Sequence, residues 1–124
     1  MVAEEGTILV AEDDEVVRAV ICRLLVLRGF DVLEAPDGEE ALELIENLSG
    51  DLDLVLTDLN MPKVGGRELA ERLARLRPGT PVLFMSGNPL TSESMDRTLP
   101  SGTAFIPKPF SADTLTRKVH ELID

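Results

Sequence analysis

Acidic, hydroxyl and amino side chains follow separate apolar runs of this sequence. Glu12 and Asp13 come directly after "TILVA", and Asp58 follows "LVLT". Ser86 comes after "VLFM", and Lys108 comes after "FIP". Each residue alone has an ordinary explanation, because Asp is common in turns and at the start of helices. Together, these residue types are the ones that hold a divalent cation and a phosphoryl group.

Three carboxylates brought to one place would repel one another unless they shared protons or bound a cation. Like charges about 4 Å apart repel by about 4 kcal/mol at an effective dielectric near ~20. An anionic site made only of oxygen ligands favours a hard ion such as Mg²⁺. Lys108 and Ser86 could both donate to a phosphoryl oxygen, so that an accessible carboxylate could act as the nucleophile.

The alternation of short apolar runs with amphipathic stretches would position these residues. Strands are expected at 7–11, 31–35, 53–57, 81–86 and 103–107. Helices are expected at 15–28, 37–48 and 66–76 and from Ser111 onward, with a short, loosely held helix over 89–99. This order predicts an α/β fold with a parallel sheet covered by helices on both faces. Right-handed crossovers then place all the carboxyl ends of the strands at one edge, where such sheets bind ligands.

Composition narrows the class of protein. The 124 residues fit one domain, no apolar run reaches the roughly 18 residues of a membrane span, and the N-terminus is acidic, unlike a secretory signal. A net charge of −11, without Trp or Tyr, argues against direct binding to nucleic acid or to an anionic membrane. The single cysteine, Cys22, excludes an internal disulfide and is expected in the core. We therefore expect a cytoplasmic protein.

Four motifs resemble those of response-regulator receiver domains, the phosphoacceptor domains of two-component signalling, which include the chemotaxis regulators. "ILVAEDDE" resembles the family's first strand and acidic pair, and "LVLTDLNMPKVGG" resembles its phosphorylation-site strand and turn. "VLFMSG" resembles its Thr/Ser strand, and "FIPKPF" its Lys-Pro signature. The likeness covers residues 7–123. It implies a flavodoxin-like (βα)5 doubly wound sheet with strand order 2-1-3-4-5, formed by a single receiver domain over 1–124 that either stands alone or is part of a hybrid kinase or larger regulator.

The resemblance also implies a phosphorylation site and a metal site. Asp58 matches the aspartate that is phosphorylated. Asp13 matches the carboxylate that binds Mg²⁺ (or Mn²⁺) directly, and Glu12 matches its partner, which usually acts through water. Asp58 itself and the backbone carbonyl of Asn60 would complete the protein ligands.

Further positions match the residues that read and limit the signal. Ser86 matches the residue that carries the switch hydroxyl, where Thr is commoner than Ser. Lys108 matches the lysine that pairs with the phosphoryl group, and the bond that joins this lysine to the following proline, here Pro109, is commonly cis. Phe105 matches the aromatic residue that changes rotamer. Two amides, Asn60 and Asn88, match positions beside the path of attacking water, which predicts a fairly labile phosphoryl group.

Three functions follow from these patterns. The first is a signalling switch, not a conventional enzyme, that catalyses its own phosphorylation from a histidine kinase or histidine phosphotransfer protein, and its own dephosphorylation. It would signal to an unknown partner through its fourth helix, fifth strand and fifth helix. The second is a Mg²⁺-dependent phosphohydrolase with an aspartyl-phosphate intermediate, which would want an acid where Asn60 stands. The third, a flavin-binding protein, would want a hydroxyl-rich loop in place of "EDDE".

Overall fold

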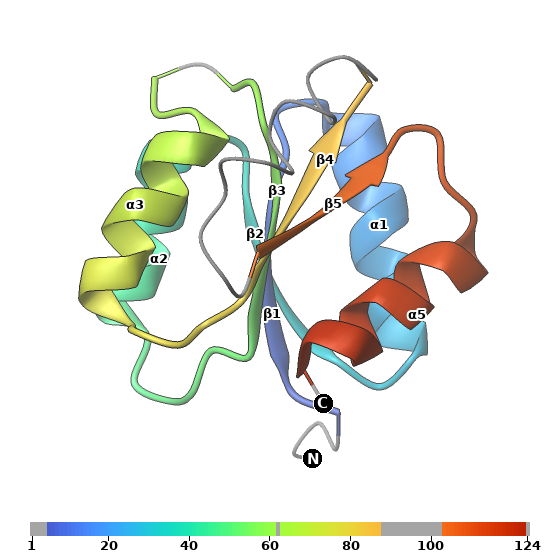
Figure 1. The fold of residues 1–124 in the computed structure, drawn as a ribbon, viewed down its shortest axis with the longest axis horizontal. Helices are drawn as coiled ribbons and strands as arrows, with labels where there is room; N and C mark the ends of the chain where they lie inside the picture. The colour runs from blue at the N-terminus through green and yellow to red at the C-terminus, as the bar shows by residue number, and fades with distance from the viewer. Residues whose placement is uncertain (1–4, 62, 88–102, 124) are drawn as a thin grey trace.

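A parallel sheet of five strands runs through the middle of the molecule (Figure 1). The computed structural model describes residues 5–61, 63–87 and 103–123. The strands are β1 (Thr7–Ala11), β2 (Asp31–Ala35), β3 (Leu54–Asp58), β4 (Val82–Ser86) and β5 (Thr103–Pro107). Their order, β2-β1-β3-β4-β5, confirms the flavodoxin-like arrangement that the resemblance implied.

Helices cover both faces of this sheet. In the described part of the chain they are α1 (Glu15–Leu27), α2 (Gly38–Asn47), α3 (Gly66–Leu76) and α5 (Ala112–Ile123). Figure 1 shows α2 and α3 on one face and α1 and α5 on the other. None of these helices combines the length and apolarity needed to cross a bilayer. The short helix predicted over 89–99 lies outside the described residues.

The alternation of side chains along β1 shows how one strand serves two cores. Ile8 and Val10 pack in the apolar cluster shared with α1 and α5. Leu9 and Ala11 pack in the cluster shared with α2 and α3. Because successive strand residues point to opposite faces, a strand buried on both sides must be apolar throughout. Cys22 is buried within the cluster shared with α1 and α5, as expected.

Side chains at the helix starts fix where each helix begins. Asp14 Oδ1 accepts the backbone N–H groups of Val16 and Val17 at 3.0 and 3.1 Å, so it caps α1. Asp37 Oδ1 accepts the N–H of Glu40 at 2.8 Å and caps α2. Such caps satisfy N–H groups that the helix leaves without internal partners. They hold each helix directly behind the loop that precedes it.

Strand β3 lies one residue later than the predicted 53–57, and this difference concerns the functional edge. Asp53 is not in the strand, and its carboxylate accepts the N–H of Thr7 at 2.8 Å. Asp58 pairs in register with Met85, and the N–H of Leu59 then donates to the Met85 carbonyl at 3.0 Å. Asp58 is therefore the last residue of the strand, where the sheet holds its backbone.

Glycine after β3 lets the chain fold back over the backbone of Asp58. The Gly66 N–H donates to the carbonyl oxygen of Leu59 at 2.9 Å. A Cβ atom on Gly66 would overlap the carbonyl oxygen of Asp58, so a larger residue could not approach this closely. The start of α3 thus packs directly on the end of β3.

Candidate functional site

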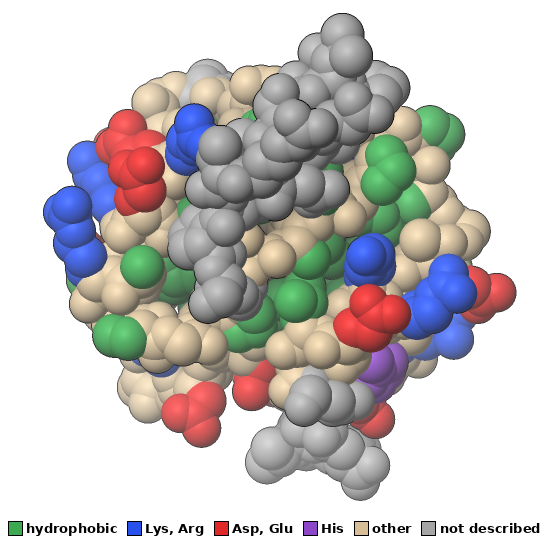
Figure 2. All heavy atoms as spheres, viewed as in Figure 1, with side chains coloured by type: hydrophobic (Ala, Val, Ile, Leu, Met, Phe, Trp, Pro, Cys, Tyr) green, Lys and Arg blue, Asp and Glu red, His purple; other side chains and the backbone are tan. Residues whose placement is uncertain are grey.

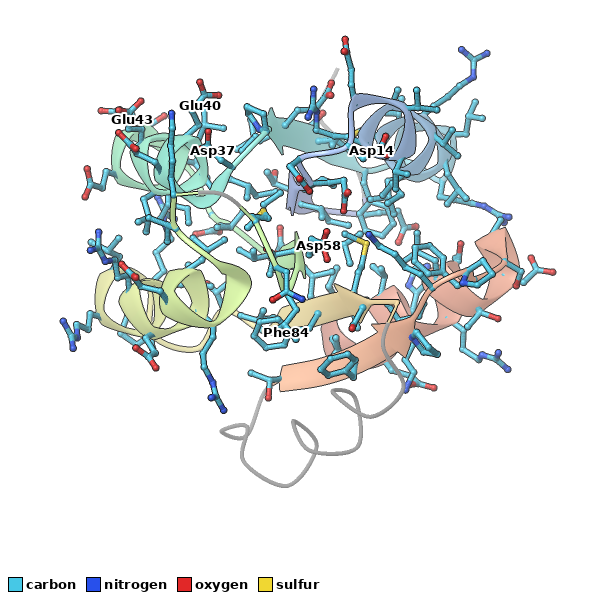
Figure 3. All side chains as sticks on the ribbon, turned by 90° about the horizontal axis from the view of Figure 1, so that it is seen from above. Asp14, Asp37, Glu40, Glu43, Asp58 and Phe84 are labelled. Atoms are coloured by element: carbon cyan, nitrogen blue, oxygen red, sulfur yellow. The ribbon has the colours of Figure 1, made fainter. Side chains whose placement is uncertain are left out.

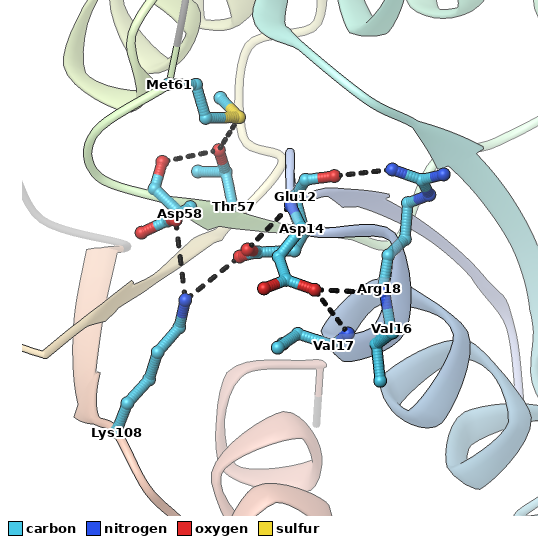
Figure 4. A network of polar contacts seen from close by, with 9 residues as sticks. All are labelled: Glu12, Asp14, Val16, Val17, Arg18, Thr57, Asp58, Met61 and Lys108. Carbon is cyan, nitrogen blue, oxygen red and sulfur yellow. Dashed lines mark hydrogen bonds and ion pairs between the residues drawn. The ribbon is translucent and has the colours of Figure 1, made fainter.

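The carboxyl ends of β1, β3 and β5 bring three acids and one lysine together. The Nζ atom of Lys108 lies 3.0 Å from Glu12 Oε2 and 3.4 Å from Asp58 Oδ2 (Figure 4). Carboxylate oxygens of Glu12, Asp13 and Asp58 all lie within 4.8 Å of one another. Seen from above, Asp58 lies between the two helical layers (Figure 3). The sequence placed these four residues at one edge, and the structure brings them together there, while their chemical roles stay predictions.

Glu12 is the buried centre of this cluster, with a relative exposure of 1%. Its N–H donates to the Ala35 carbonyl at 3.1 Å, and its carbonyl accepts Nη1 of Arg18 at 2.8 Å. Its Oε1 accepts the N–H of Asp14 at 3.2 Å, and its Oε2 accepts Lys108. The backbone and the side chain of Glu12 are both held by hydrogen bonds, so its carboxylate has a fixed position next to the ammonium of Lys108.

The ionisation of Glu12 and Lys108 reflects their burial and their contact. Burial raises the pKa of Glu12, and the charge of Asp58 adds to this, although the hydrogen bond from Lys108 opposes it. Burial alone would lower the pKa of Lys108, but its contacts with Glu12 and Asp58 raise that pKa overall. The cluster holds three carboxylates and only one ammonium, an excess of acidic groups that a divalent cation would balance.

The backbone around Asp58 is fixed while its carboxylate reaches the surface. Thr57 is fully buried, and its Oγ1 donates to the carbonyl oxygen of Asp58 at 3.0 Å. The same hydroxyl lies 4.0 Å from the sulfur of Met61 (Figure 4). The side chain of Asp58 has a relative exposure of 15%. A carboxylate that is both held and accessible suits a nucleophile or a metal ligand.

Ser86 and Lys108 are joined through the backbone. Ser86 ends β4, is buried, and accepts the Lys108 N–H on its carbonyl oxygen at 2.8 Å. The bond between Lys108 and Pro109 is cis, as the family resemblance implied. Because β4 pairs with β3, Ser86 is on the strand next to Asp58.

The remaining predicted residues are more dispersed. Asn60 is exposed two residues after Asp58. Phe105 is buried in β5, with its ring centroid 6.1 Å from that of Phe84. Its predicted rotamer change stays a prediction. Asn88 lies outside the described residues.

Two residues that hold this site were missed in the sequence. Thr57 is a hydroxyl at a fully buried strand position, which is the signal that could have indicated a backbone contact. Arg18 is a single cation in the otherwise apolar stretch "VVRAVIC" of α1. A lone charge in such a helix usually has a specific partner when it is buried. Its partners are the carbonyl of Glu12 and the carboxylate of Glu34.

Comparison with known proteins identifies the family. The chain belongs to the response regulator receiver domains, whose family model matches residues 8–120. It is 38% identical over 121 residues to the sensor kinase CckA of Brucella abortus (strain 2308), covering 96% of this chain and 13% of the kinase. It is 33% identical over 116 residues to the response regulator MprA of Mycobacterium sp. (strain KMS), covering 94% of this chain and 50% of that protein. The chain thus spans at most half the length of these relatives.

Solved structures agree with this family. The receiver domain of the hybrid histidine kinase CckA superposes with a TM-score of 0.83 at 38% identity, covering 96% of this chain and 100% of that one. TrrA of Thermotoga maritima, solved in complex with Mg²⁺ and BeF, gives a TM-score of 0.81 at 26% identity, covering 94% and 98%.

The chain is therefore a phosphorelay signalling switch of two-component systems, and the phosphohydrolase alternative is not favoured. Membership of this family implies a histidine kinase as partner. Receiver domains bind Mg²⁺ at an acidic pocket, and this chain has an acidic cluster in Glu12, Asp13 and Asp58.

Proposed function

We propose that this chain accepts a phosphoryl group on Asp58 from a phosphohistidine donor while Asp13 and Asp58 bind Mg²⁺. The observation that carries this proposal is the contact of one ammonium, Lys108 Nζ, with both Glu12 and Asp58. Lys108 follows β5, Glu12 and Asp13 follow β1, and Asp58 ends β3, so three strands contribute to one reacting centre. Such an arrangement stabilises negative charge that develops on a transferring group.

The donor set fits Mg²⁺. Carboxylate oxygens from Glu12, Asp13 and Asp58 lie within 4.8 Å of one another, and no nitrogen or sulfur ligand is among them. Mg²⁺ prefers oxygen ligands and keeps several waters, so one or two direct carboxylates are enough. Exposed Asp13 and half-buried Asp58 would bind directly with the carbonyl of Asn60, and buried Glu12 would act through water. When bound, Mg²⁺ neutralises charge on the transferring oxygens.

The chain's own residues would carry out the transfer as follows. An oxygen of Asp58 attacks the phosphorus atom and forms a new O–P bond. The P–N bond to the donor histidine breaks, and the imidazole nitrogen keeps the electron pair. Lys108 already contacts Asp58 and then donates to a phosphoryl oxygen. Glu12 keeps the ammonium in place from the buried side.

An apolar groove beside the site gives the donor protein a place to bind. Val16 and Val20 on α1 are 73% and 61% exposed and lie one helical turn apart on the same side of the helix. The groove is lined by Val16, Val17, Val20, Ile21, Lys108, Pro109 and Phe110. Figure 2 shows hydrophobic side chains at the surface near the end of β5, at the upper right. Because Lys108 belongs to both groove and site, a donor protein bound in the groove would lie next to Asp58.

A donor test separates this groove from the chemistry. Substituting Val16→Glu should slow phosphorylation by a phosphohistidine protein about tenfold, because a charge enters an apolar contact. Phosphorylation by acetyl phosphate, which needs no docking, should be unchanged. Val26→Glu is the matched control, since Val26 is exposed on the same helix outside the groove. Equal slowing with both donors, or by both substitutions, would argue against the groove.

The phosphoryl group would act on the fold through Ser86 and Phe105, and its lifetime would depend on Asn60 and Asn88. Ser86 would donate to a phosphoryl oxygen, and Phe105 would change its packing on Phe84, which shifts the population between two arrangements of β5 and α5. Small amides leave room for attacking water. Replacing both asparagines with bulky side chains should slow the decay of the phosphorylated protein, and an unaltered rate would contradict this.

The experiment that tests the proposed function is incubation with acetyl phosphate and Mg²⁺. A stoichiometric adduct that is stable in acid and labile in base is the expected result, because acyl phosphates behave in this way. Continuous phosphate release without an accumulating adduct would favour a phosphohydrolase instead. No reaction at all would overturn the proposal.

A further inference from the structure

We propose that Arg18 is a positioning residue of the cation site, which fixes the peptide between Glu12 and Asp13 so that the Asp13 carboxylate faces Asp58. This inference rests on the proposed function, because it requires Asp13 and Asp58 to hold the cation together. Arg18 does not touch the reacting atoms. It would act through the backbone of the acidic loop.

The guanidinium of Arg18 spans the gap between the acidic loop and β2. Its Nη1 donates to the Glu12 carbonyl oxygen at 2.8 Å, and its Nε lies 3.5 Å from Glu34 Oε1 (Figure 4 shows the first contact). Its own N–H donates to the carbonyl of Asp14 at 2.9 Å. The side chain is only 16% exposed, so α1, the loop and β2 together define its position.

The atom that Arg18 holds decides the direction of Asp13. The carbonyl oxygen of Glu12 belongs to the planar peptide group that continues into the N–H and Cα of Asp13. Holding that oxygen therefore sets the orientation in which Asp13 leaves the loop. The other contacts of Glu12, to Ala35 and Lys108, hold its N–H and its carboxylate.

Positioning and plain electrostatics predict opposite effects of removing Arg18. A positive charge near a cation site opposes binding of the cation, so its loss alone would tighten binding. If Arg18 positions Asp13, its loss weakens binding instead. Lysine keeps the charge but lacks the planar fork that reaches two partners at once. Arg18→Lys therefore separates the geometry from the charge.

The test is a titration with Mn²⁺, with the free ion measured by its electron paramagnetic resonance signal. The full chain is compared with Arg18→Gln and Arg18→Lys, and we expect both variants to bind about tenfold more weakly, as when residues behind metal ligands are replaced. Arg23→Gln is the control, since Arg23 is exposed on the same helix and loses the same charge. We expect its Mn²⁺ affinity to be unchanged.

A second pair of measurements excludes a purely structural role. The metal concentration for half-maximal phosphorylation by acetyl phosphate should rise about tenfold in Arg18→Lys, while the rate at saturating metal returns to that of the unmodified chain. Glu34→Gln removes the partly exposed anchor of Arg18, together with one negative charge, and should weaken Mn²⁺ binding about threefold, less than the loss of Arg18 itself.

The inference would be overturned if Arg18→Gln bound Mn²⁺ as tightly as the unmodified chain or more tightly. It would also be overturned if Arg18→Lys bound Mn²⁺ like the unmodified chain, or if its phosphorylation rate stayed low at saturating metal. Two further results would overturn it. One is Mn²⁺ binding that Glu34→Gln leaves unchanged, and the other is a loss of Mn²⁺ affinity in the Arg23→Gln control as large as the loss in Arg18→Gln. Failure of the unmodified chain to bind Mn²⁺ would overturn the proposed function itself.

Discussion

The two edges of the sheet treat their charges in different ways. At the edge where the strands begin, Asp53 accepts the N–H of Thr7 at 2.8 Å. There the guanidinium of Arg77 donates to the carbonyls of Gly50 and Leu48 at 2.7 and 2.6 Å. Each of these charges is satisfied by backbone groups.

At the edge where the strands end, charged side chains contact other charged side chains. Lys108 lies between Glu12 and Asp58, and Asp13 adds a third carboxylate. Like charges held this close together cost free energy unless a ligand balances them. A charge that backbone groups satisfy stabilises the fold. A cluster of side chains whose charges do not cancel can bind a cation, and the bound cation can then stabilise an anionic group at the same place.

Asparagine substitution at each edge should give the largest contrast. Asp58→Asn removes the nucleophile, so no phosphoryl adduct should form with acetyl phosphate, as measured by the intact mass of the protein. Asp53→Asn should leave phosphorylation intact and lower the free energy of unfolding by about 1 kcal/mol, because a hydrogen bond to a charged group is weakened. If Asp58→Asn still gained a phosphoryl group, the two edges would not differ as described.

Methionine in place of each cation gives a smaller contrast. Lys108→Met should slow phosphorylation by acetyl phosphate about a hundredfold, since a group that stabilises developing charge is lost. Arg77→Met should keep the rate and lower the free energy of unfolding by about 2 kcal/mol, because its backbone contacts are lost. Mass spectra of samples quenched at set times would measure the phosphorylation rates, and denaturant titrations would measure the free energies of unfolding. A rate unchanged by Lys108→Met would contradict the assignment of this lysine.

Metal should stabilise the fold only through the edge where the strands end. At ten times its dissociation constant, Mg²⁺ should raise the free energy of unfolding by about 1.4 kcal/mol. Asp13→Asn should abolish this gain and, without metal, should stabilise the protein by about 1 kcal/mol, because repulsion between carboxylates is relieved. Asp14→Asn is the matched control, since it keeps the capping oxygen and should retain the Mg²⁺ effect. Equal stabilisation of all three proteins would place the cation elsewhere.

The smallest effect concerns alkaline pH. The pKa of Lys108 is raised above its ordinary value of 10.5 in the folded chain, so its contribution to stability is complete below that value and is lost as pH rises through the folded pKa. The difference in unfolding free energy between the metal-free chain and Lys108→Met should therefore be constant near pH ~9 and shrink toward pH ~12. A difference that did not change over this range would contradict the shift.

The strands and the edge at which the site forms could be predicted, because both depend on patterns along the chain. Apolar runs of five or six residues separated by amphipathic stretches indicate a parallel sheet, and a parallel sheet collects its carboxyl ends at one edge. Asp58 was predicted just beyond β3 and is its last residue, because register depends on hydrogen bonds to β4 that no local pattern specifies.

The supports of the site could not be predicted in the same way. Arg18 reaches the Glu12 carbonyl across the turn between β1 and α1, and the contact depends on the angle at which the helix leaves the strand. Close packing of Gly66 on the Asp58 carbonyl likewise depends on how α3 docks. Such contacts follow from tertiary packing, whereas the charged residues themselves are visible as types and spacing.

The most direct measurement is a crystal structure of the chain with Mg²⁺ and beryllium fluoride, which mimics a phosphoryl group. We expect beryllium bonded to an oxygen of Asp58 and Mg²⁺ at about 2.1 Å from oxygens of Asp13 and Asp58. Lys108 Nζ should lie within hydrogen-bonding distance of a fluoride. Beryllium fluoride bound away from Asp58, or Mg²⁺ without Asp13 among its ligands, would contradict the proposed site.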